Sequence, residues 1–330
     1  GRSALAANTT AVKNTAIGRA AMESNTTGAE NTALGYSALY ANTTGTRNTA
    51  VGRSAGGAIT TGGNNTAMGY SALATNTLGD RNVAIGEGAL AVHNVTSNAD
   101  TYNVAVGFDA GAAVTTGIQN TLIGSKAGDS LTTSAGNVAV GYEALSTETA
   151  YSENTAIGYR ALKVNSGGYY NTAVGYEALL ANTDGLKNTA VGGNALTANT
   201  TGDDNTAVGS DALDANTTGS FNSAFGEGAL TANTTAHYNA AFGDAALEAN
   251  TTGDSNSSVG HASMRANTTG SDNVAVGTSA LNANTTASSN IGIGLNALKL
   301  TTTGGGNTAV GSSALAANTT AIVNTAVGYQ

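Results

Sequence analysis

The sequence lacks most of the residues that globular domains use to build and fasten a core. Its 330 residues contain no Pro, Cys or Trp, only 12 Tyr and 4 Phe, and 33 charged residues. Without Cys the chain has neither disulfides nor thiolate metal sites. So few aromatic side chains leave a single large core short of bulk. Disorder fits no better, because disordered chains are rich in Pro and in charge.

Charge and hydropathy exclude two further classes of partner. The formal net charge is −9 at pH 7. Nucleic acids and anionic membrane surfaces bind basic patches, so we expect no nucleic-acid partner. No apolar run approaches the roughly 18 residues of a membrane-spanning helix, so we expect no membrane insertion in this segment. No charged-then-apolar leader is present, and we expect any secretion signal to lie outside the segment.

What the sequence has instead is a repeat. Cutting after the Gly of each NTAVG-like pentapeptide gives 19 units with the consensus xxALxANTTGxxNTAVG. Eighteen units have 17 residues, and the unit at 87–107 has a four-residue insertion. Repeats of this length predict stacked units that share one core. We therefore predict a single continuous solenoid over 1–330, with one irregular repeat at 87–107.

The alternation inside each unit predicts a strand. Positions 14 and 16 of the repeat are β-branched or apolar and lie two residues apart, which is the period of a strand with one buried face. We expect both positions to face inward, together with the Leu at position 4, and the NTTG segment to form a polar turn. The predicted fold is all-β: a parallel β-solenoid of the left-handed β-roll type with 19 rungs of 17 residues.

Two positions of the repeat do not vary at all. Position 13 is Asn and position 17 is Gly in all 19 units. Side-chain amides stacked at strand spacing can hydrogen-bond one another along the stack, so we predict a structural ladder of Asn. The Gly predicts a corner with positive φ or close backbone approach. Representative ladder residues are Asn14, Asn31, Asn48, Asn171, Asn188, Asn205 and Asn324, and representative corners are Gly18, Gly52, Gly175, Gly192 and Gly209.

Positions 4 and 7 vary together. Position 4 is Gly instead of a large apolar residue in three units, at Gly56, Gly111 and Gly128. In the same units position 7 changes from its usual polar residue to Ile59, Val114 and Leu131. We interpret this exchange as two ways of filling one interior volume, which close packing requires to stay full.

Position 15 lies between the two positions that we expect to face inward, and it should therefore face outward. It is nevertheless Ala in 16 units. A row of small apolar side chains on an outer face predicts contact with another chain, and we predict lateral self-association as a homotrimer. The alternative is that this face packs against another part of the same rung. Representatives of the predicted chain–chain stripe are Ala50, Ala173, Ala190 and Ala207.

The strand sequence with its fixed Gly resembles known repeats. NTAVG and NVAIG are similar to the β-roll head repeats of trimeric autotransporter adhesins. The longer units at 176–192 (YEALLANTDGLKNTAVG) and 108–124 (FDAGAAVTTGIQNTLIG) look like repeats in the tail-fibre-domain proteins of bacteria and their phages. Both resemblances imply a left-handed parallel β-roll, trimeric association and an extracellular, cell-surface or virion location.

Taken together, these features predict a non-enzymatic structural fibre or adhesin shaft. The three His residues fall in different units and there is no Cys, so we expect no catalytic residues, no metal site and no cofactor. Neither end of the sequence shows a polar cap, which predicts a piece of a longer array or rods that join into a filament. The alternative function is an ice- or glycan-binding β-solenoid.

Local recognition of a host surface or glycan, if present, is expected at irregular units, because insertions lie in loops on one face. Aromatic and His residues gather in and near the irregular repeat. They predict a surface contact for glycans or for a neighbouring filament, and the alternative is that the Tyr side chains shield the turn. These residues are His93, Tyr102, Tyr151, Tyr169 and Tyr170.

Overall fold

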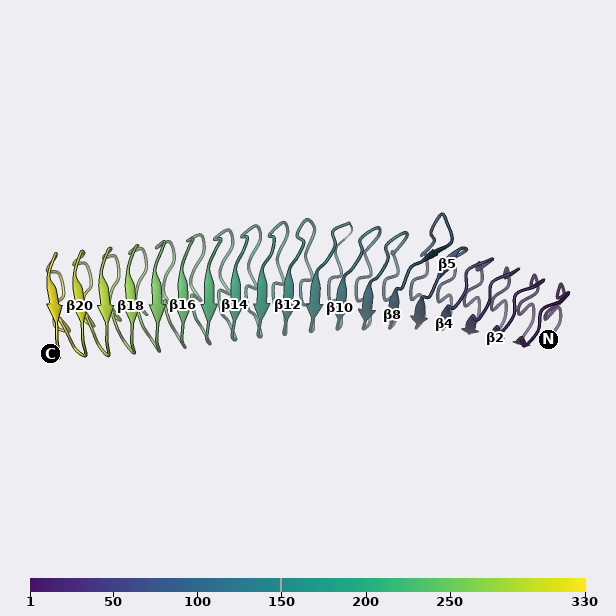
Figure 1. Cartoon of the computed structure of the whole chain (residues 1–330), viewed down its shortest axis with the longest axis horizontal. Coiled ribbons are helices and arrows are strands. Elements are labelled where there is room, and N and C mark those ends of the chain that lie inside the picture. The colour runs from purple at the N-terminus through teal and green to yellow at the C-terminus, as the bar shows by residue number, and fades with distance from the viewer. Residues whose placement is uncertain (149) are drawn as a thin grey trace. The chain divides into compact units, whose positions relative to one another are not determined.

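The computed structural model describes residues 1–148 and 150–330. It confirms the predicted fold class: the chain is an all-β parallel β-solenoid with about 17 residues per rung, and the described residues contain no helix. Accordingly, no helix in this part of the chain could cross a membrane. The rungs form two compact units, Gly1–Gly167 and Gly168–Gln330, which are described separately. Within each unit the strands of successive rungs lie side by side (Figure 1). The single continuous solenoid and its handedness stay predictions.

The first unit contains one parallel ladder and one short additional pair. The ladder runs in the order β1–β2–β3–β4–β6–β8–β9–β10–β11, so each three-residue strand pairs with the strand of the next rung. The two-residue strands β5 and β7 pair at the irregular repeat. The bounds are β1 Thr15–Ile17, β2 Thr32–Leu34, β3 Thr49–Val51, β4 Thr66–Met68, β5 Gly79–Asp80, β6 Val83–Ile85, β7 Ala99–Asp100, β8 Val104–Val106, β9 Thr121–Ile123, β10 Val138–Val140 and β11 Thr155–Ile157.

The second unit contains one parallel ladder in chain order, from β12 to β21. Its register is constant at 17 residues, as in the pair Ala190↔Ala207. Equal positions of the repeat therefore form columns along the unit. The bounds are β12 Thr172–Val174, β13 Thr189–Val191, β14 Thr206–Val208, β15 Ser223–Phe225, β16 Ala240–Phe242, β17 Ser257–Val259, β18 Val274–Val276, β19 Ile291–Ile293, β20 Thr308–Val310 and β21 Thr325–Val327.

Backbone hydrogen bonds join successive rungs outside the strands as well. The amide of Leu39 donates to the carbonyl of Ala55 at 3.0 Å, and the amide of Thr43 donates to the carbonyl of Thr60 at 2.9 Å. A rung is therefore bonded to its neighbours on every side, and its three-residue strand is only the most regular part. Because all of these bonds connect different rungs, stacking supplies the stability that a single rung lacks.

The interior of each rung is narrow. The Leu at position 4 and the Ala residues at positions 3 and 15 fill it, as Leu196, Ala195 and Ala190 show with 0% exposure. The predicted orientation of the strand is therefore wrong. Position 15 faces inward, and positions 14 and 16 face outward, because only a methyl group fits opposite the Leu column in so thin a core.

The volume exchange between positions 4 and 7 is confirmed. A Cβ added at Gly56 would lie 3.0 Å from Cδ1 of Ile59, and one added at Gly128 would lie 2.7 Å from Cδ1 of Leu131. The side chain at position 7 thus reaches into the space that the position 4 side chain fills elsewhere. Ile59, Val114 and Leu131 are all fully buried.

Exceptions at position 15 are also matched by their neighbours. Leu122 is the one large residue there, and it lies against the two glycines Gly111 and Gly128, where an added Cβ would approach its methyl groups to 2.7 Å. The polar exception is Ser258, whose hydroxyl donates to the carbonyl of Ser263 at 2.9 Å and also bonds the Ser263 hydroxyl. Ser263 is itself the one residue other than Ala at position 3.

Each rung also holds several residues in the left-handed region of φ. Non-Gly residues have φ near +50 to +63° at positions 2, 4 and 12, as in Ser37 (55°), Leu39 (50°) and Arg47 (59°). Such a conformation costs about 1–2 kcal/mol for an L-residue. The tight turns of a 17-residue rung require it, and the hydrogen bonds between rungs offset the cost.

Candidate functional site: the outer strand face

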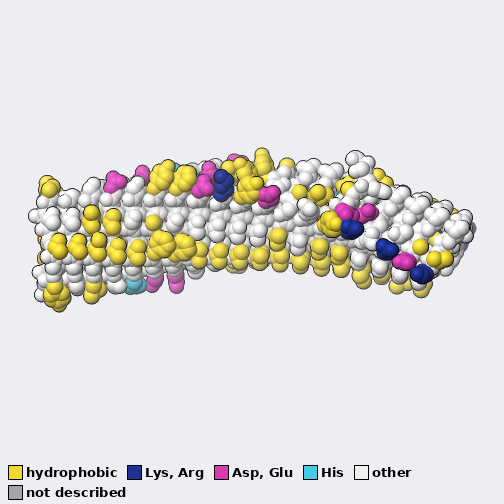
Figure 2. Space-filling model, in the orientation of Figure 1, with side chains coloured by type: hydrophobic (Ala, Val, Ile, Leu, Met, Phe, Trp, Pro, Cys, Tyr) yellow, Lys and Arg dark blue, Asp and Glu magenta, His cyan; other side chains and the backbone are white. Residues whose placement is uncertain are grey.

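The side chains at positions 14 and 16 form a continuous exposed surface on each unit, which we call the outer strand face. None of these side chains is buried. Position 16 is apolar in every rung, and several of its side chains are strongly exposed, including Ile17 at 58%, Leu34 at 45% and Phe242 at 41%. Hydrophobic side chains follow lines along the surface in Figure 2.

The outer strand face carries no charge in any rung. Position 14 contributes Thr, Ser, Ala, Val or Ile, and position 16 contributes Val, Ile, Leu, Met or Phe. The rings of Phe225 and Phe242 stack at 4.9 Å between centroids, as expected for equal residues on successive rungs. An apolar column of this length on a chain with a net charge of −9 is a surface that water solvates poorly.

The predicted chain–chain stripe at position 15 is not on the surface. Ala50, Ala173, Ala190 and Ala207 are 0% exposed and lie inside their own units. They cannot contact another chain, and the alternative that this face packs within the rung is correct. The exposed apolar column is one residue away, at position 16.

The Asn residues at position 13 join each rung to the next. The amide N–H of Asn31 donates to Oδ1 of Asn14 at 2.8 Å, and Nδ2 of Asn31 donates to the carbonyl of Gly45 at 2.8 Å. Nδ2 of Asn205 likewise bonds Gly219 at 2.8 Å. In some rungs the predicted bond between side-chain amides is also present, as where Nδ2 of Asn324 donates to Oδ1 of Asn307 at 3.0 Å. The column is thus a ladder in which the backbone amide is the main donor.

A second Asn ladder lies at position 7, which from the sequence we interpret only as a turn residue. There the side-chain amides bond each other directly: Nδ2 of Asn42 donates to Oδ1 of Asn25 at 2.7 Å, and Nδ2 of Asn284 donates to Oδ1 of Asn267 at 2.7 Å. The sequence does contain a sign of this second ladder, because position 7 is Asn in 13 of 19 units. The ladder ends where the next rung has a residue other than Asn at position 7, and Oδ1 of Asn42 and of Asn284 then have no hydrogen-bond partner among the described residues.

The corner glycines have positive φ and touch one another. Gly18 has φ of 134° and Gly192 of 137°. A Cβ added at Gly192 would lie 2.4 Å from the carbonyl oxygen of Gly209. Any side chain at this position would collide with the backbone of the next rung, which explains why position 17 does not vary.

Charged side chains at the variable positions pair between neighbouring rungs. Glu30 accepts from Arg47 at 3.2 Å and from Lys13 at 3.4 Å, and these cations, Arg47 first, lower the pKa of Glu30. Glu143 contacts Nζ of Lys163 at 2.5 Å, and this bond is the largest cause that lowers its pKa to about 2. The pairs of Glu30 are exposed and therefore contribute little to stability, whereas Glu143 and Lys163 are partly covered.

The irregular repeat does not form the predicted surface cluster. His93 is 0% exposed, so its assignment as a surface contact is wrong: it takes the position 7 slot of the second ladder, inside the rung. Tyr102 is 46% exposed, and its hydroxyl bonds Oδ2 of Asp100 at 3.0 Å. Arg81 lies over the Tyr102 ring at 5.5 Å and bonds Asp100 at 2.5 Å. Tyr102 thus fastens the insertion to the preceding rung.

The remaining Tyr residues predicted near the insertion lie on the surface of their own units. Tyr151 is 42% exposed in the first unit. Tyr169 and Tyr170 belong to the second unit, where their rings meet edge to face at 5.2 Å. Tyr170 is 53% exposed and Tyr169 is half-buried. These residues are accessible, but His93 does not join them.

His93 is the clearest electrostatic anomaly. Neither of its ring nitrogens has a hydrogen-bond partner among the described residues. Burial disfavours the charged imidazolium and lowers the pKa of His93 to about 4, while the Thr115 backbone acts weakly in the opposite direction. The ring is therefore neutral at pH 7.

The described residues contain no group of three or more His, Asp and Glu that could hold a metal ion. Comparison with known family models and with curated protein sequences finds no match for this chain. The resemblance to adhesin and tail-fibre repeats therefore rests on the repeat itself.

Proposed function

We propose that the protein is a non-enzymatic structural fibre or adhesin shaft that self-associates laterally through its outer strand faces, as a homotrimer. The supporting observation is the uncharged column at position 16, which is half-buried or exposed in every rung yet always apolar. An exposed strand position under no constraint would admit Lys, Glu or Ser, as positions 1, 11 and 12 do.

A second copy is the partner that fits this face. A partner must present an apolar surface without charge over many successive rungs, and another copy does so with the same repeat distance. Burying apolar area contributes roughly 25 cal/mol per Å², so small contributions from each rung add up along a column. The repeat's resemblance to adhesin heads and tail fibres supports an extracellular, cell-surface or virion location.

The test is the mass of the protein in solution. For the wild type we expect light scattering to give three times the chain mass of 32.1 kDa. The variant F225K/F242K/V259K places three charges on the outer strand face of the second unit, at side chains that are 37%, 41% and 44% exposed. It should keep the β-rich circular dichroism spectrum and lose the trimer.

The matched control is T218K/T235K/T252K, which changes exposed Thr residues in the turns of the same region. It adds the same charge and should remain trimeric. A wild-type mass equal to one chain, or loss of the trimer in both triple variants alike, would refute association through the outer strand face.

Ice binding is a second candidate, because the outer strand face presents Thr in register on successive rungs. Thr172, Thr189 and Thr206 are paired in this way at position 14 and face outward. Bulky residues such as Phe225 interrupt the flat surface in other rungs. Thermal hysteresis of the wild type that is lost on replacing the three Thr residues by Lys would establish this candidate, and its absence would remove it.

A further inference from the structure

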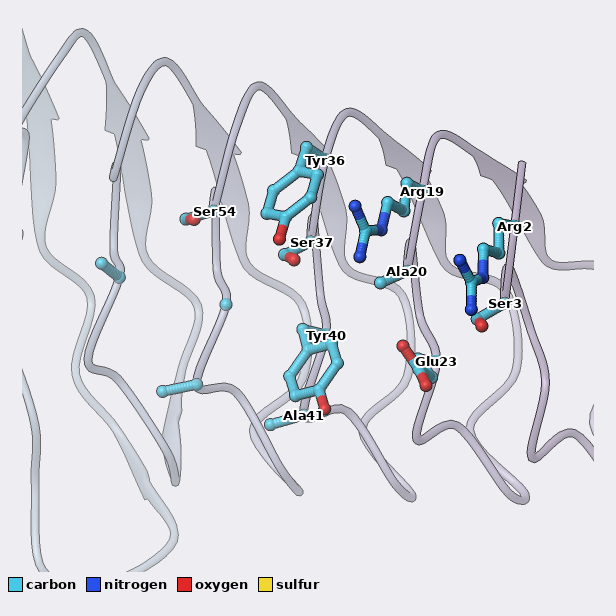
Figure 3. Close-up of a pocket in the computed structure, with 13 residues that line it drawn as sticks. Arg2, Ser3, Arg19, Ala20, Glu23, Tyr36, Ser37, Tyr40, Ala41 and Ser54 are labelled. Atoms are coloured by element: carbon cyan, nitrogen blue, oxygen red, sulfur yellow. The ribbon is translucent and has the colours of Figure 1, made fainter.

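A groove of about 780 Å³ crosses the first rungs on a face other than the outer strand face. Its walls come from positions 1, 2, 5 and 6 of successive rungs. Figure 3 shows Arg2, Arg19 and Tyr36 in one row along the rungs, with Glu23 and Tyr40 in a second row beside it. Its volume falls within the range of small-ligand sites.

The cations of the groove are not neutralised by ion pairs. Among the described residues no carboxylate lies within salt-bridge distance of Arg2, Arg19 or Arg53, although Lys13 and Arg47 of the same rungs both pair with Glu30. Arg19 and Arg53 lie over the Tyr36 ring, at 5.7 and 5.8 Å from its centroid. Both faces of that ring are thus covered, and the guanidinium groups are held in place with their N–H donors free for a ligand.

This positive region is exceptional in the chain. Residues 1–86 contain six Lys and Arg against three Asp and Glu, whereas residues 87–330 contain six against eighteen. The local excess of positive charge favours an anionic ligand over a neutral one.

Tyr40 offers an open aromatic face. It is 44% exposed, and the next residues in its column are Gly57 and Ala74, which have no side chain or only a methyl group. The space beside the ring, over Gly57 and Ala58, is therefore part of the groove. Ser37 and Ser54 add hydroxyl groups, and Glu23 adds an acceptor at the edge.

We propose that this groove binds a carboxylate-bearing saccharide, such as a uronate or sialate residue of an acidic glycan. The guanidinium groups of Arg2 and Arg19 would hold the carboxylate, since Arg matches that group with paired N–H donors. The apolar face of the sugar ring would stack on Tyr40. Sugar hydroxyls would donate to Glu23 and exchange hydrogen bonds with Ser37 and Ser54. The combination of an acceptor carboxylate with free cations suits a polyhydroxylated anion better than a simple one.

Calorimetric titration with trigalacturonate tests the proposal, with galactotriose as the neutral probe and citrate as a carboxylate without a sugar ring. We expect trigalacturonate to bind at least about tenfold more tightly than either. R19Q and Y40A should each weaken its binding by about tenfold or more.

A third variant, G57L, blocks the groove without removing a polar contact. Leu occurs at the same repeat position as Leu180, so the fold accommodates it. It should abolish binding, whereas R47Q, on another face of the same rungs, should leave binding unchanged. The proposal is overturned if trigalacturonate does not bind at millimolar concentration, if citrate binds equally well, or if G57L binds like the wild type.

The groove lies within single chains of the first unit, so its test is independent of self-association. Variants of the outer strand face that lose the trimer should still bind trigalacturonate, and R19Q should remain trimeric. Either proposal can therefore fail alone.

Discussion

At the scale of single residues, the rung depends on conformations that most side chains avoid. Positions 2, 4 and 12 hold left-handed φ in almost every rung, and only some rungs use Gly there, such as Gly136 and Gly306 at position 12. Stability is therefore open to improvement at exposed left-handed positions, because Asn adopts this region more easily than long side chains do.

Lys187 provides the test. It has φ of 54° at position 12 of its rung, and none of the described residues forms an ion pair with it. K187N should raise the free energy of unfolding by about 0.5–1 kcal/mol. Thermal denaturation measures this gain in stability. K126N is not a suitable control, because Lys126 also has a left-handed φ, at 57°. K299N, at an exposed position outside this region, should give no gain.

A second residue-scale prediction concerns His93. Its folded pKa of about 4 lies below the ordinary value of 6.5, so the unfolded chain binds the proton more tightly. Stability should fall as the pH drops from 6.5 towards 4, by up to about 3 kcal/mol. H93N should remove this part of the pH dependence. Denaturation of both proteins at pH 7 and pH 4.5 measures the difference, since the other two His residues, His237 and His261, are common to both.

At the scale of the rung, positions 4 and 7 form one packing unit. Leu39 beside Asn42, and Ile59 beside Gly56, occupy the corresponding interior space in neighbouring rungs. The exchange also affects hydrogen bonding, because Ile59 ends the amide ladder and leaves Oδ1 of Asn42 without a partner in the part of the chain that the structure describes.

A double-mutant cycle tests this unit. G56L alone should cost about 1–3 kcal/mol through overpacking against Ile59. I59N alone should cost more than about 2 kcal/mol, because it leaves a cavity beside Gly56. The double variant G56L/I59N recreates the common rung and gives Asn42 a partner, so we expect it to be nearly as stable as the wild type. Additive losses in chemical denaturation would contradict the shared volume.

The rung also shows how far the sequence alone leads. The repeat, the corner glycines and the exchange of Gly56 with Ile59 could be predicted, because each leaves a periodic or paired change in the sequence. Which face of the strand is buried could not be predicted. Alternation gives two faces but does not say which is buried, and Val or Ile at position 16 looks more like core than Ala at position 15 does. Only the width of the rung decides this.

The same limit applies to the candidate sites. His93 looks like a surface residue because it stands in an irregular segment, yet its place in the column of position 7 buries it. The groove beside Tyr40 depends on small residues in the following rungs, Gly57 and Ala74, and so becomes visible only when the rungs are stacked.

At the scale of the whole molecule, the repeat makes the chain modular. Contacts in each unit connect a rung mainly to its two neighbours, so rungs are exchangeable as long as the columns stay in register. Every column depends on this register. The amide ladders and the corner glycines require the same residue type 17 positions apart, as in Asn188 and Asn205.

Deletions within the second unit test this modularity. Removing 193–209 takes out one whole rung and should preserve the β-rich circular dichroism spectrum with a small loss of stability. Removing 193–200 takes out half a rung, places charged and polar residues in interior columns, and should abolish cooperative unfolding. Equal effects of the two deletions would contradict a fold held by columns.

The amide ladders also determine how the protein ages. Spontaneous deamidation of a ladder Asn replaces Nδ2, a donor, by an oxygen that can only accept. In the column of Asn199, Asn216 and Asn233, each Nδ2 donates to the preceding Oδ1 at 2.8–2.9 Å. Deamidation of one of these Asn residues would place a carboxylate directly against a neighbouring amide oxygen. The repulsion between the two oxygens is poorly screened, because the site is buried. Long-term integrity is therefore a chemical property of the amides, and the dense hydrogen bonding that builds the ladder also holds each amide away from the backbone attack that would destroy it.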